Sequence, residues 1–142
     1  PVYDFEAGKL TADDFVLRGL QLNDHFINDS NNDWKHQGML FGSAFIGYNE
    51  YGVSVDKKNL INRVLLNIYT PTRRGIAMGD TKYLLLFVYG MPTRIVESTT
   101  NSGTSTVYEY KNPAASNSYL QFALDEKNQY IKSVMLSDRP VK

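Results

Sequence analysis

Hydrophobic and polar positions divide this chain into short β-like runs and one continuous apolar block. The block is Tyr83–Tyr89, seven apolar residues in succession, a pattern that suits a buried strand as well as a buried helix. Its flanks favour the helix, because Asp80 or Thr81 is a capping residue and Gly90 followed by Pro92 is a typical stop. The pattern therefore predicts a helix over this block.

The predicted helix lacks a polar face. A helix that is apolar all round is normally buried on more than one side. Either the two halves of the chain enclose it, or a second chain covers it.

Most of the remaining pattern predicts strands separated by turns. Thr11–Asp14 predicts a capped helical turn and Asp24–Asn32 a short, poor helix. Ser98–Ser105 contains only Ser, Thr, Asn and Gly, which predicts a mobile loop. The expected strands or extended arms are Phe15–Leu22, Gly38–Tyr48, Val53–Val55, Leu60–Tyr69, Thr93–Glu97, Thr106–Lys111, Tyr119–Asp125 and Tyr130–Leu136.

Two short signatures occur twice in the same order. Gly19–Asp24 matches Gly75–Asp80 in its apolar pattern, first glycine and final aspartate, and Val55–Asn59 matches Leu124–Asn128. A recurrence at this scale predicts two similar units. We expect a single domain over 1–142, made of repeats at about 15–69 and 73–138 that are joined by 70–72.

The second half resembles a known group through its opening at Gly75–Thr81, the stop Tyr89–Pro92, the strand Tyr108–Tyr110 and the hairpin Phe122–Asn128. It is similar to the SmpA/OmlA outer-membrane assembly lipoproteins and to the β-lactamase-inhibitor-protein-like fold. The resemblance implies an α+β fold of two repeats. Each repeat would be a short helical segment followed by an antiparallel β-meander, with the helices packed on one face of the sheet.

Composition narrows the classes of function. The chain has 142 residues, 15 basic and 15 acidic, so its formal net charge is zero and no basic stripe is available for nucleic acid. It contains no cysteine, which excludes disulfides and thiolate chemistry. No apolar run approaches a membrane span. The missing start methionine and polar loops favour an extracellular or cell-surface protein whose signal peptide or lipid anchor has been removed.

Candidate sites for metals and catalysis are weak. Asp29–Asp33 begins like a calcium loop, but Trp34 and Leu40 occupy the positions of the required glycine and glutamate. His25 and His36 lack the spacing of a helical zinc pair. No nucleophile elbow or phosphate-binding glycine loop is present. We therefore expect no enzyme activity, no cofactor and no metal.

The remaining signal is aromatic, because tyrosine is common in protein interfaces. We expect a binding module that contacts a protein or a component of the cell envelope through an open sheet face. We also expect that the chain can form a homodimer. The alternative is a carrier with an apolar pocket lined by Leu84, Phe87 and Phe122. Packing between strands is the competing explanation for the tyrosines. The predicted binding residues are Tyr51, Tyr69, Tyr119, Gln121, Tyr130 and Lys132.

Overall fold

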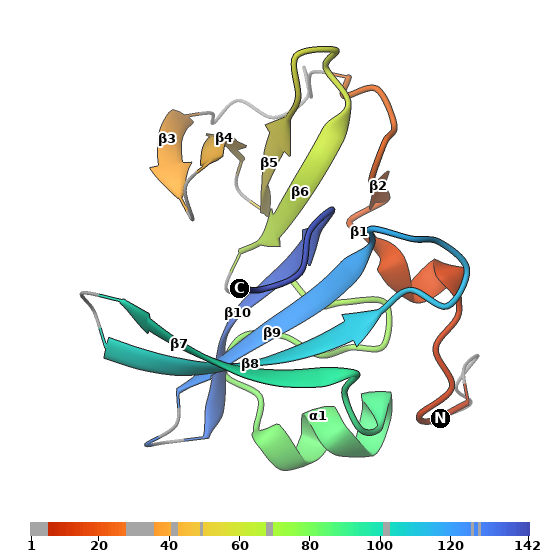
Figure 1. Cartoon of the computed structure of the whole chain (residues 1–142), viewed down its shortest axis with the longest axis vertical. Coiled ribbons are helices and arrows are strands. Elements are labelled where there is room, and N and C mark those ends of the chain that lie inside the picture. Colours follow the sequence, from red (N-terminus) through yellow and green to blue (C-terminus); the bar gives the residue numbers. More distant parts are fainter. Residues whose placement is uncertain are drawn as a thin grey trace.

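Eight strands of this protein form one antiparallel sheet, and a single α-helix lies against part of it (Figure 1). The computed structural model describes residues 6–27, 36–40, 43–48, 50–67, 70–100, 103–125, 127 and 129–142. The structural statements below concern these residues.

The strand order is β3-β4-β5-β6-β10-β9-β8-β7, so each half of the chain forms a four-stranded meander. The two meanders join where β6 pairs antiparallel with β10, with Val64 opposite Leu136. A separate two-residue ladder joins β1 to β2. The bounds are β1 Val16–Leu17, β2 Leu20–Gln21, β3 His36–Leu40, β4 Ser43–Gly47, β5 Tyr51–Val55, β6 Ile61–Leu66, β7 Arg94–Thr100, β8 Gly103–Lys111, β9 Tyr119–Asp125 and β10 Tyr130–Ser137.

The core lies between one face of this sheet and the segments that cross it. Tyr108, Phe122 and Val134 are directly opposite one another on β8, β9 and β10, so their side chains share that face. The alternation of strands brings every second residue to this side. On the helix, Tyr89 packs its ring 5.1 Å from Phe122 and 5.6 Å from Tyr110.

The helix α1 occupies Lys82–Tyr89, as its capping signals predict. A 3₁₀-helix, η1, occupies Ala12–Phe15 behind Thr11, which agrees with the predicted helical turn. The predicted fold class is wrong, however. The protein is mostly β, with one α-helix among the described residues and one large sheet, instead of two units that each combine a helix with a meander.

The predicted helix at Asp24–Asn32 does not begin at Asp24, because the backbone there is bonded to the sheet. Asn23 N donates to Ile61 O at 2.8 Å, and Ile61 N donates to Asp24 O at 2.9 Å. Phe26 N then donates to Asn59 O at 3.0 Å. These bonds hold the chain extended, so a capping residue has no helix to cap. Residues 28–32 lie outside the described residues.

The same pair of backbone bonds recurs at the second signature. Gly79 N donates to Ile131 O at 2.7 Å, and Ile131 N donates to Asp80 O at 2.9 Å. Asn23 and Gly79 both have positive φ, 71° and 94°. The recurring sequence therefore encodes a pair of backbone hydrogen bonds to the strand that follows a hairpin. The helix is not part of what recurs. The predicted repeat boundaries stay a prediction.

One strand prediction and one loop prediction needed correction. Gly38–Tyr48 is not one bulged strand, because β3 and β4 form a hairpin in which Leu40 lies opposite Ser43. Ser98–Ser105 is not a loop at its ends, because β7 and β8 continue to Thr100 and Gly103. Threonine is β-branched and suits a ladder whatever its polarity. Polar composition alone therefore misidentified this hairpin.

Candidate interaction surface on helix α1

Helix α1 is positioned by both of its ends. At the N-terminus, the Thr81 hydroxyl accepts a hydrogen bond from Leu84 N at 3.2 Å. At the C-terminus, Gly90 has φ 76° and its N–H donates to Leu86 O at 2.9 Å. A Cβ on Gly90 would lie 2.9 Å from the Cα of Gly8, so only glycine lets the chain turn here.

The inner face of α1 is buried against the sheet. It consists of Leu85, Val88 and Tyr89. The Tyr89 hydroxyl donates to Thr72 Oγ1 at 2.7 Å, so the buried phenol keeps a hydrogen-bond partner. Burial raises the pKa of Tyr89 to about 12, because the phenolate would lose its hydration. Burial also raises the pKa of Tyr110, whose hydroxyl donates to Gly90 O at 2.8 Å.

A buried arginine fixes the C-terminal end of α1. Arg74 Nη1 donates to Val88 O at 2.9 Å, and Arg74 Nε and Nη2 bind the Asp14 carboxylate at 2.7 and 3.0 Å. Further bonds from this guanidinium reach the backbone oxygens of Glu6 at 3.1 Å and Lys9 at 2.7 Å. All five guanidinium N–H groups therefore have an acceptor, which is the condition for a stable buried charge.

The outer face of α1 is apolar and open to solvent. Tyr83 is 67 % exposed, Leu84 43 % and Phe87 76 %, and Met91 beyond the helix end is 77 % exposed. We call these four residues the α1 surface. A helix packed on one side normally carries polar residues on the other. Here the outer positions carry none.

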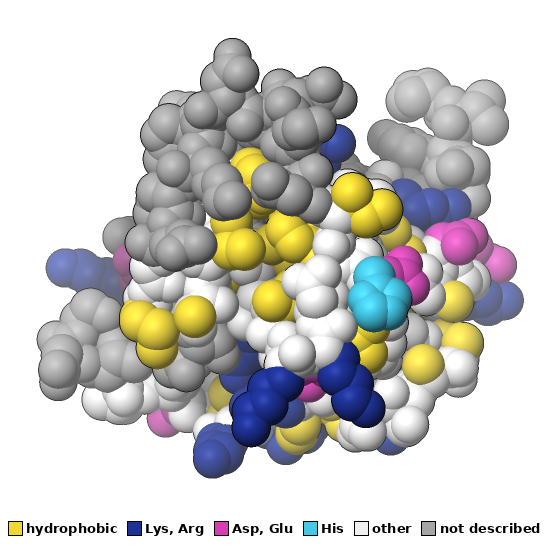
Figure 2. All heavy atoms as spheres, turned by 90° about the horizontal axis from the view of Figure 1, so that it is seen from above, with side chains coloured by type: hydrophobic (Ala, Val, Ile, Leu, Met, Phe, Trp, Pro, Cys, Tyr) yellow, Lys and Arg dark blue, Asp and Glu magenta, His cyan; other side chains and the backbone are white. Residues whose placement is uncertain are grey.

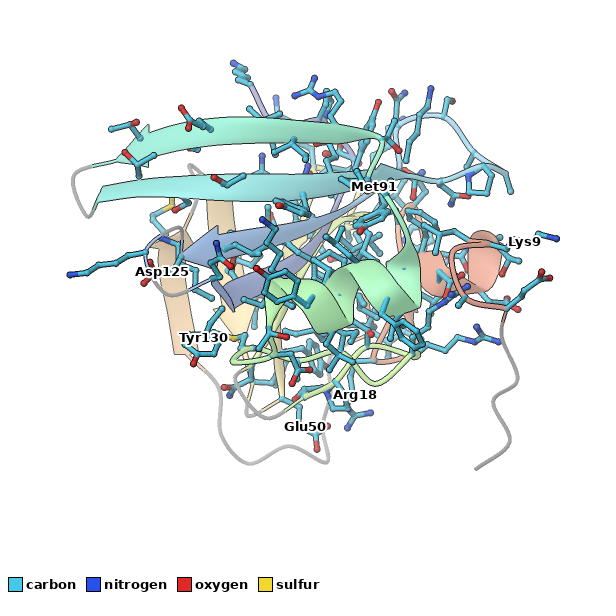
Figure 3. The ribbon with its side chains drawn as sticks, turned by 90° about the horizontal axis from the view of Figure 1, so that it is seen from below. Lys9, Arg18, Glu50, Met91, Asp125 and Tyr130 are labelled. Carbon is cyan, nitrogen blue, oxygen red and sulfur yellow. The ribbon has the colours of Figure 1, made fainter. Side chains whose placement is uncertain are left out.

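Two half-exposed hydrophobic residues lie on the same side of the molecule. Tyr130 forms an isolated bridge with Thr81 at the start of α1. Ile95 on β7 lies opposite Tyr108, so it shares the sheet face against which the helix packs. Figure 3 looks at this side and shows Tyr130 near one end of α1 and Met91 near the other. The apolar area therefore extends past both ends of the helix.

The opposite end of the molecule has a different character. Figure 2 shows it with basic side chains, acidic side chains and a histidine among uncharged polar groups and several hydrophobic areas. On the described part of the chain, six of the eight exposed large hydrophobic residues belong to α1 and its two neighbouring strands (β7, β10) or to Met91; the other two are Ile27 and Met39.

The six residues predicted for binding do not form one surface. Tyr51 is buried in the core, and Tyr69 lies outside the described residues. Tyr119 and Gln121 lie on the sheet face opposite the core. Tyr130 is half-exposed beside α1, and Lys132 is exposed at the bulge between Ile131 and Ser133.

The sheet face expected to be open is covered around Gln121 by the C-terminal segment 138–142. Gln121 Nε2 donates to Arg139 O at 3.0 Å and to Glu109 Oε2 at 2.9 Å. Val141 N also donates to Glu109 Oε2, at 2.7 Å. Gln121 is therefore a buried structural residue, because it anchors this segment. The absence of polar residues from the helix had predicted that the other half of the chain or a second chain covers it, and Leu84 and Phe87 were expected to line a pocket. The binding residues were nevertheless expected on the sheet, away from the exposed residues of α1.

The three residues of the predicted carrier pocket are also separate. Leu84 and Phe87 face solvent, whereas Phe122 is fully buried. An open depression of about 400 Å³ lies elsewhere, lined by Asp13, Val16, Arg18, Gly19, Pro71, Thr72 and Arg73.

Three polar residues of that depression already have structural partners. Arg18 is paired with Glu50, and Arg73 Nη1 lies 3.5 Å from Asp14 Oδ1. Thr72 Oγ1 accepts bonds from Tyr89 and from Ile76 N. Arg18, Arg73 and Thr72 therefore form contacts within the protein at this depression.

Several candidate metal ligands and buried carboxylates can be placed in the described part of the chain. No group of three His, Cys, Asp or Glu residues is arranged to hold a metal ion there. His25 is exposed, and the predicted calcium loop at Asp29–Asp33 lies outside the described residues. The buried carboxylates of Asp14 and Glu109 both accept structural hydrogen bonds. Among the described residues, no helix has the length and apolarity needed to cross a membrane.

Comparisons with known proteins identify only a distant similarity. No protein-family model matches the chain, and no curated protein matches it significantly. Among solved structures, it is similar to a crystal structure of a DUF4309 family protein, YjgB, from Bacillus subtilis subsp. subtilis str. 168. The sequence identity is 17 % and the TM-score 0.48, over 85 % of this chain and 72 % of that one.

Proposed function

We propose that this protein is a binding module that recognises another protein through the α1 surface. The observation that carries the proposal is the exposure of Tyr83, Phe87 and Met91, three large apolar side chains on one side of a short helix. Aromatic residues and methionine are enriched in protein interfaces. The proposal places binding on the helix, away from the sheet face expected from the sequence.

The size of this surface supports the proposal. The four exposed fractions correspond to about 500 Å² of accessible area, given side chains of roughly 150–250 Å² each. A typical monomer has a largest apolar patch of about 300–600 Å², and patches at the upper end are often functional. The α1 surface is therefore within the size range of the largest apolar patch on a typical monomer, the patch that is often functional.

The fold explains how such a surface is maintained. The inner face of α1 is held by Leu85, Val88 and Tyr89, and its ends are held by Thr81 and Gly90. The helix therefore does not need its outer side chains for its own packing. A rigid, preformed apolar surface loses little conformational entropy when a partner binds.

Site-specific photo-crosslinking tests the proposal. A photoreactive residue introduced as Phe87→p-benzoylphenylalanine in the full chain should form a protein adduct in the cells from which the gene comes. The matched control is Ile27→p-benzoylphenylalanine, because Ile27 is 84 % exposed and lies outside the α1 surface. Adding Met91→Asp to the Phe87 variant should reduce the adduct at least tenfold. Equal adducts from positions 27 and 87, or none from position 87, would contradict the proposal.

A further inference from the structure

The α1 surface has properties that select a particular partner, and we infer that this partner is a second copy of the same chain. This inference rests on the proposed function and names the protein that is bound. Three observations on the molecule carry it: the area of the surface, its lack of charge and the neutrality of the whole chain.

The available area approaches what a stable dimer needs. With the half-exposed Tyr130 and Ile95 at its borders, the apolar area reaches about 700 Å², on the same side-chain areas. A standard interface buries about 800 Å² on each partner. Backbone and polar atoms at the border of the surface add to the apolar part. One α1 surface against another therefore accounts for a standard interface without a second contact region.

The chemistry of the surface is compatible with itself. In a twofold dimer the same residues meet around the axis, so any charge there faces the like charge of the other copy. None of the four residues of the α1 surface is charged. Lys82, the first residue of the helix, places its Nζ over the Tyr83 ring, 5.9 Å from the ring centre, so one positive charge borders the surface at this end. Two copies that meet at Leu84, Phe87 and Met91 therefore bring no charged residue of this surface together, and none of these three residues selects an oppositely charged partner.

The whole molecule also lacks long-range repulsion between copies. Its 15 basic and 15 acidic residues cancel. Proteins with net charge near zero associate more readily than charged ones. A neutral chain that exposes this apolar area is therefore suited to self-association.

The helix geometry suggests how two copies would pack. Tyr83 and Phe87 are one turn apart and form a ridge along α1, with Leu84 beside it. Ridges of this i, i+4 type on two helices interdigitate at a crossing angle of about −50°. Phe87 is the central member between Tyr83 and Met91. It is accordingly the position at which one charge should have the largest effect.

Sedimentation equilibrium of the purified chain tests the inference. The wild-type chain should have a molecular mass of twice 16.1 kDa at micromolar concentration. Phe87→Glu should weaken self-association at least 100-fold, because it places a carboxylate beside its own copy in an apolar interface. The control Ile27→Glu introduces the same charge at an exposed site elsewhere and should remain dimeric. Circular dichroism should show that both variants are folded.

The possible results separate this inference from the proposed function. A monomeric wild-type chain at 100 μM, or a Phe87→Glu variant that still dimerises, would overturn the dimer. If a monomeric chain nevertheless gives an adduct from position 87 with a different protein, the proposed function stands and the partner is another protein. If the monomer gives no protein adduct and binds phosphatidylcholine vesicles through Phe87, both proposals fail and the surface is a lipid-contacting one.

Discussion

The burial of single residues in this protein does not follow from whether they are polar or apolar. Glu109 is 1 % exposed, although glutamate is normally a surface residue. Its carboxylate accepts bonds from Gln121 and from Val141 N. Phe87 shows the opposite, because it is apolar and 76 % exposed. Glu109 is buried because its partners Gln121 and Val141 are distant in the sequence but close in space. Phe87 is exposed because its side of the helix does not face the sheet.

Tyr89 makes stability depend on alkaline pH. The pKa of its buried phenol is raised to about 12, above the ordinary value of about 10. The folded state therefore holds this proton more tightly than the unfolded state. The resulting stability is fully present below pH 10 and is lost between pH 10 and 12, at about 1 kcal/mol per pH unit. Urea unfolding from pH 8 to 11 should show at least this slope, because burial also raises the pKa of Tyr110, which adds a loss of stability of the same sign.

The variant Tyr89→Phe tests whether Tyr89 causes this pH dependence. Tyr89→Phe removes the titrating group, so the slope above pH 10 should be smaller than in the wild type. At pH 8 the variant should be about 1 kcal/mol less stable, because the hydrogen bond to Thr72 is lost. An unchanged alkaline slope would show that Tyr89 is not the source of the pH dependence.

At the scale of elements, local hydrogen bonds determine where helix α1 begins and ends, and packing determines its orientation. Thr81 and Gly90 set its two ends through short-range bonds. Its orientation is set by Leu85, Val88 and Tyr89, which pack against the sheet. The hydrophobic pattern of α1 has no polar side, so it does not determine which face points inward. Only the neighbouring strands make that choice.

The end of α1 should be sensitive to the loss of one glycine. Gly90→Ala introduces a Cβ 2.9 Å from the Cα of Gly8, in addition to the strain of positive φ. Gly75→Ala is the matched control, because Gly75 has φ 85° and no atom within 4 Å of the added Cβ.

We expect Gly75→Ala to cost about 1 kcal/mol and Gly90→Ala at least 1 kcal/mol more. Thermal unfolding of both variants measures the difference. Similar melting temperatures would mean that residues 8 and 90 are not in close contact.

At the scale of the whole molecule, Arg74 connects segments that are far apart in the chain. Its guanidinium binds Asp14 in η1, the backbone of the N-terminal segment at Glu6 and Lys9, and Val88 in α1. These segments have no shared strand ladder. The arginine therefore links them, together with the backbone bond from Gly8 N to Val88 O at 3.2 Å.

Replacing Arg74 should destabilise the whole fold. Arg74→Met leaves the buried Asp14 carboxylate without its main partner, which should cost about 3–5 kcal/mol of unfolding free energy. Arg74→Lys keeps the charge but loses the planar set of five donors, so its loss should be smaller.

Arg73→Met is the control, because Arg73 is partly exposed and 3.5 Å from Asp14, and it should cost about 1 kcal/mol or less. Chemical denaturation compares the three variants. Equal losses for Arg73→Met and Arg74→Met would contradict the central role of Arg74.

What the sequence determined by itself is the set of features encoded by neighbouring residues. The ends of α1, the turn before Phe15 and the strand Tyr119–Asp125 were all predicted correctly. Capping, turn formation and strand alternation act over a few residues, so a single sequence contains their causes.

The tertiary structure decided the features that depend on distant partners. Asp24 begins no helix because its carbonyl accepts a bond from Ile61, and Gln121 is covered because a segment 18 residues away binds it. The exposure of Phe87 is of the same kind, since the sheet reaches only one side of α1. Burial is a property of how the elements pack, and an apolar pattern records the tendency to be buried without specifying what covers it.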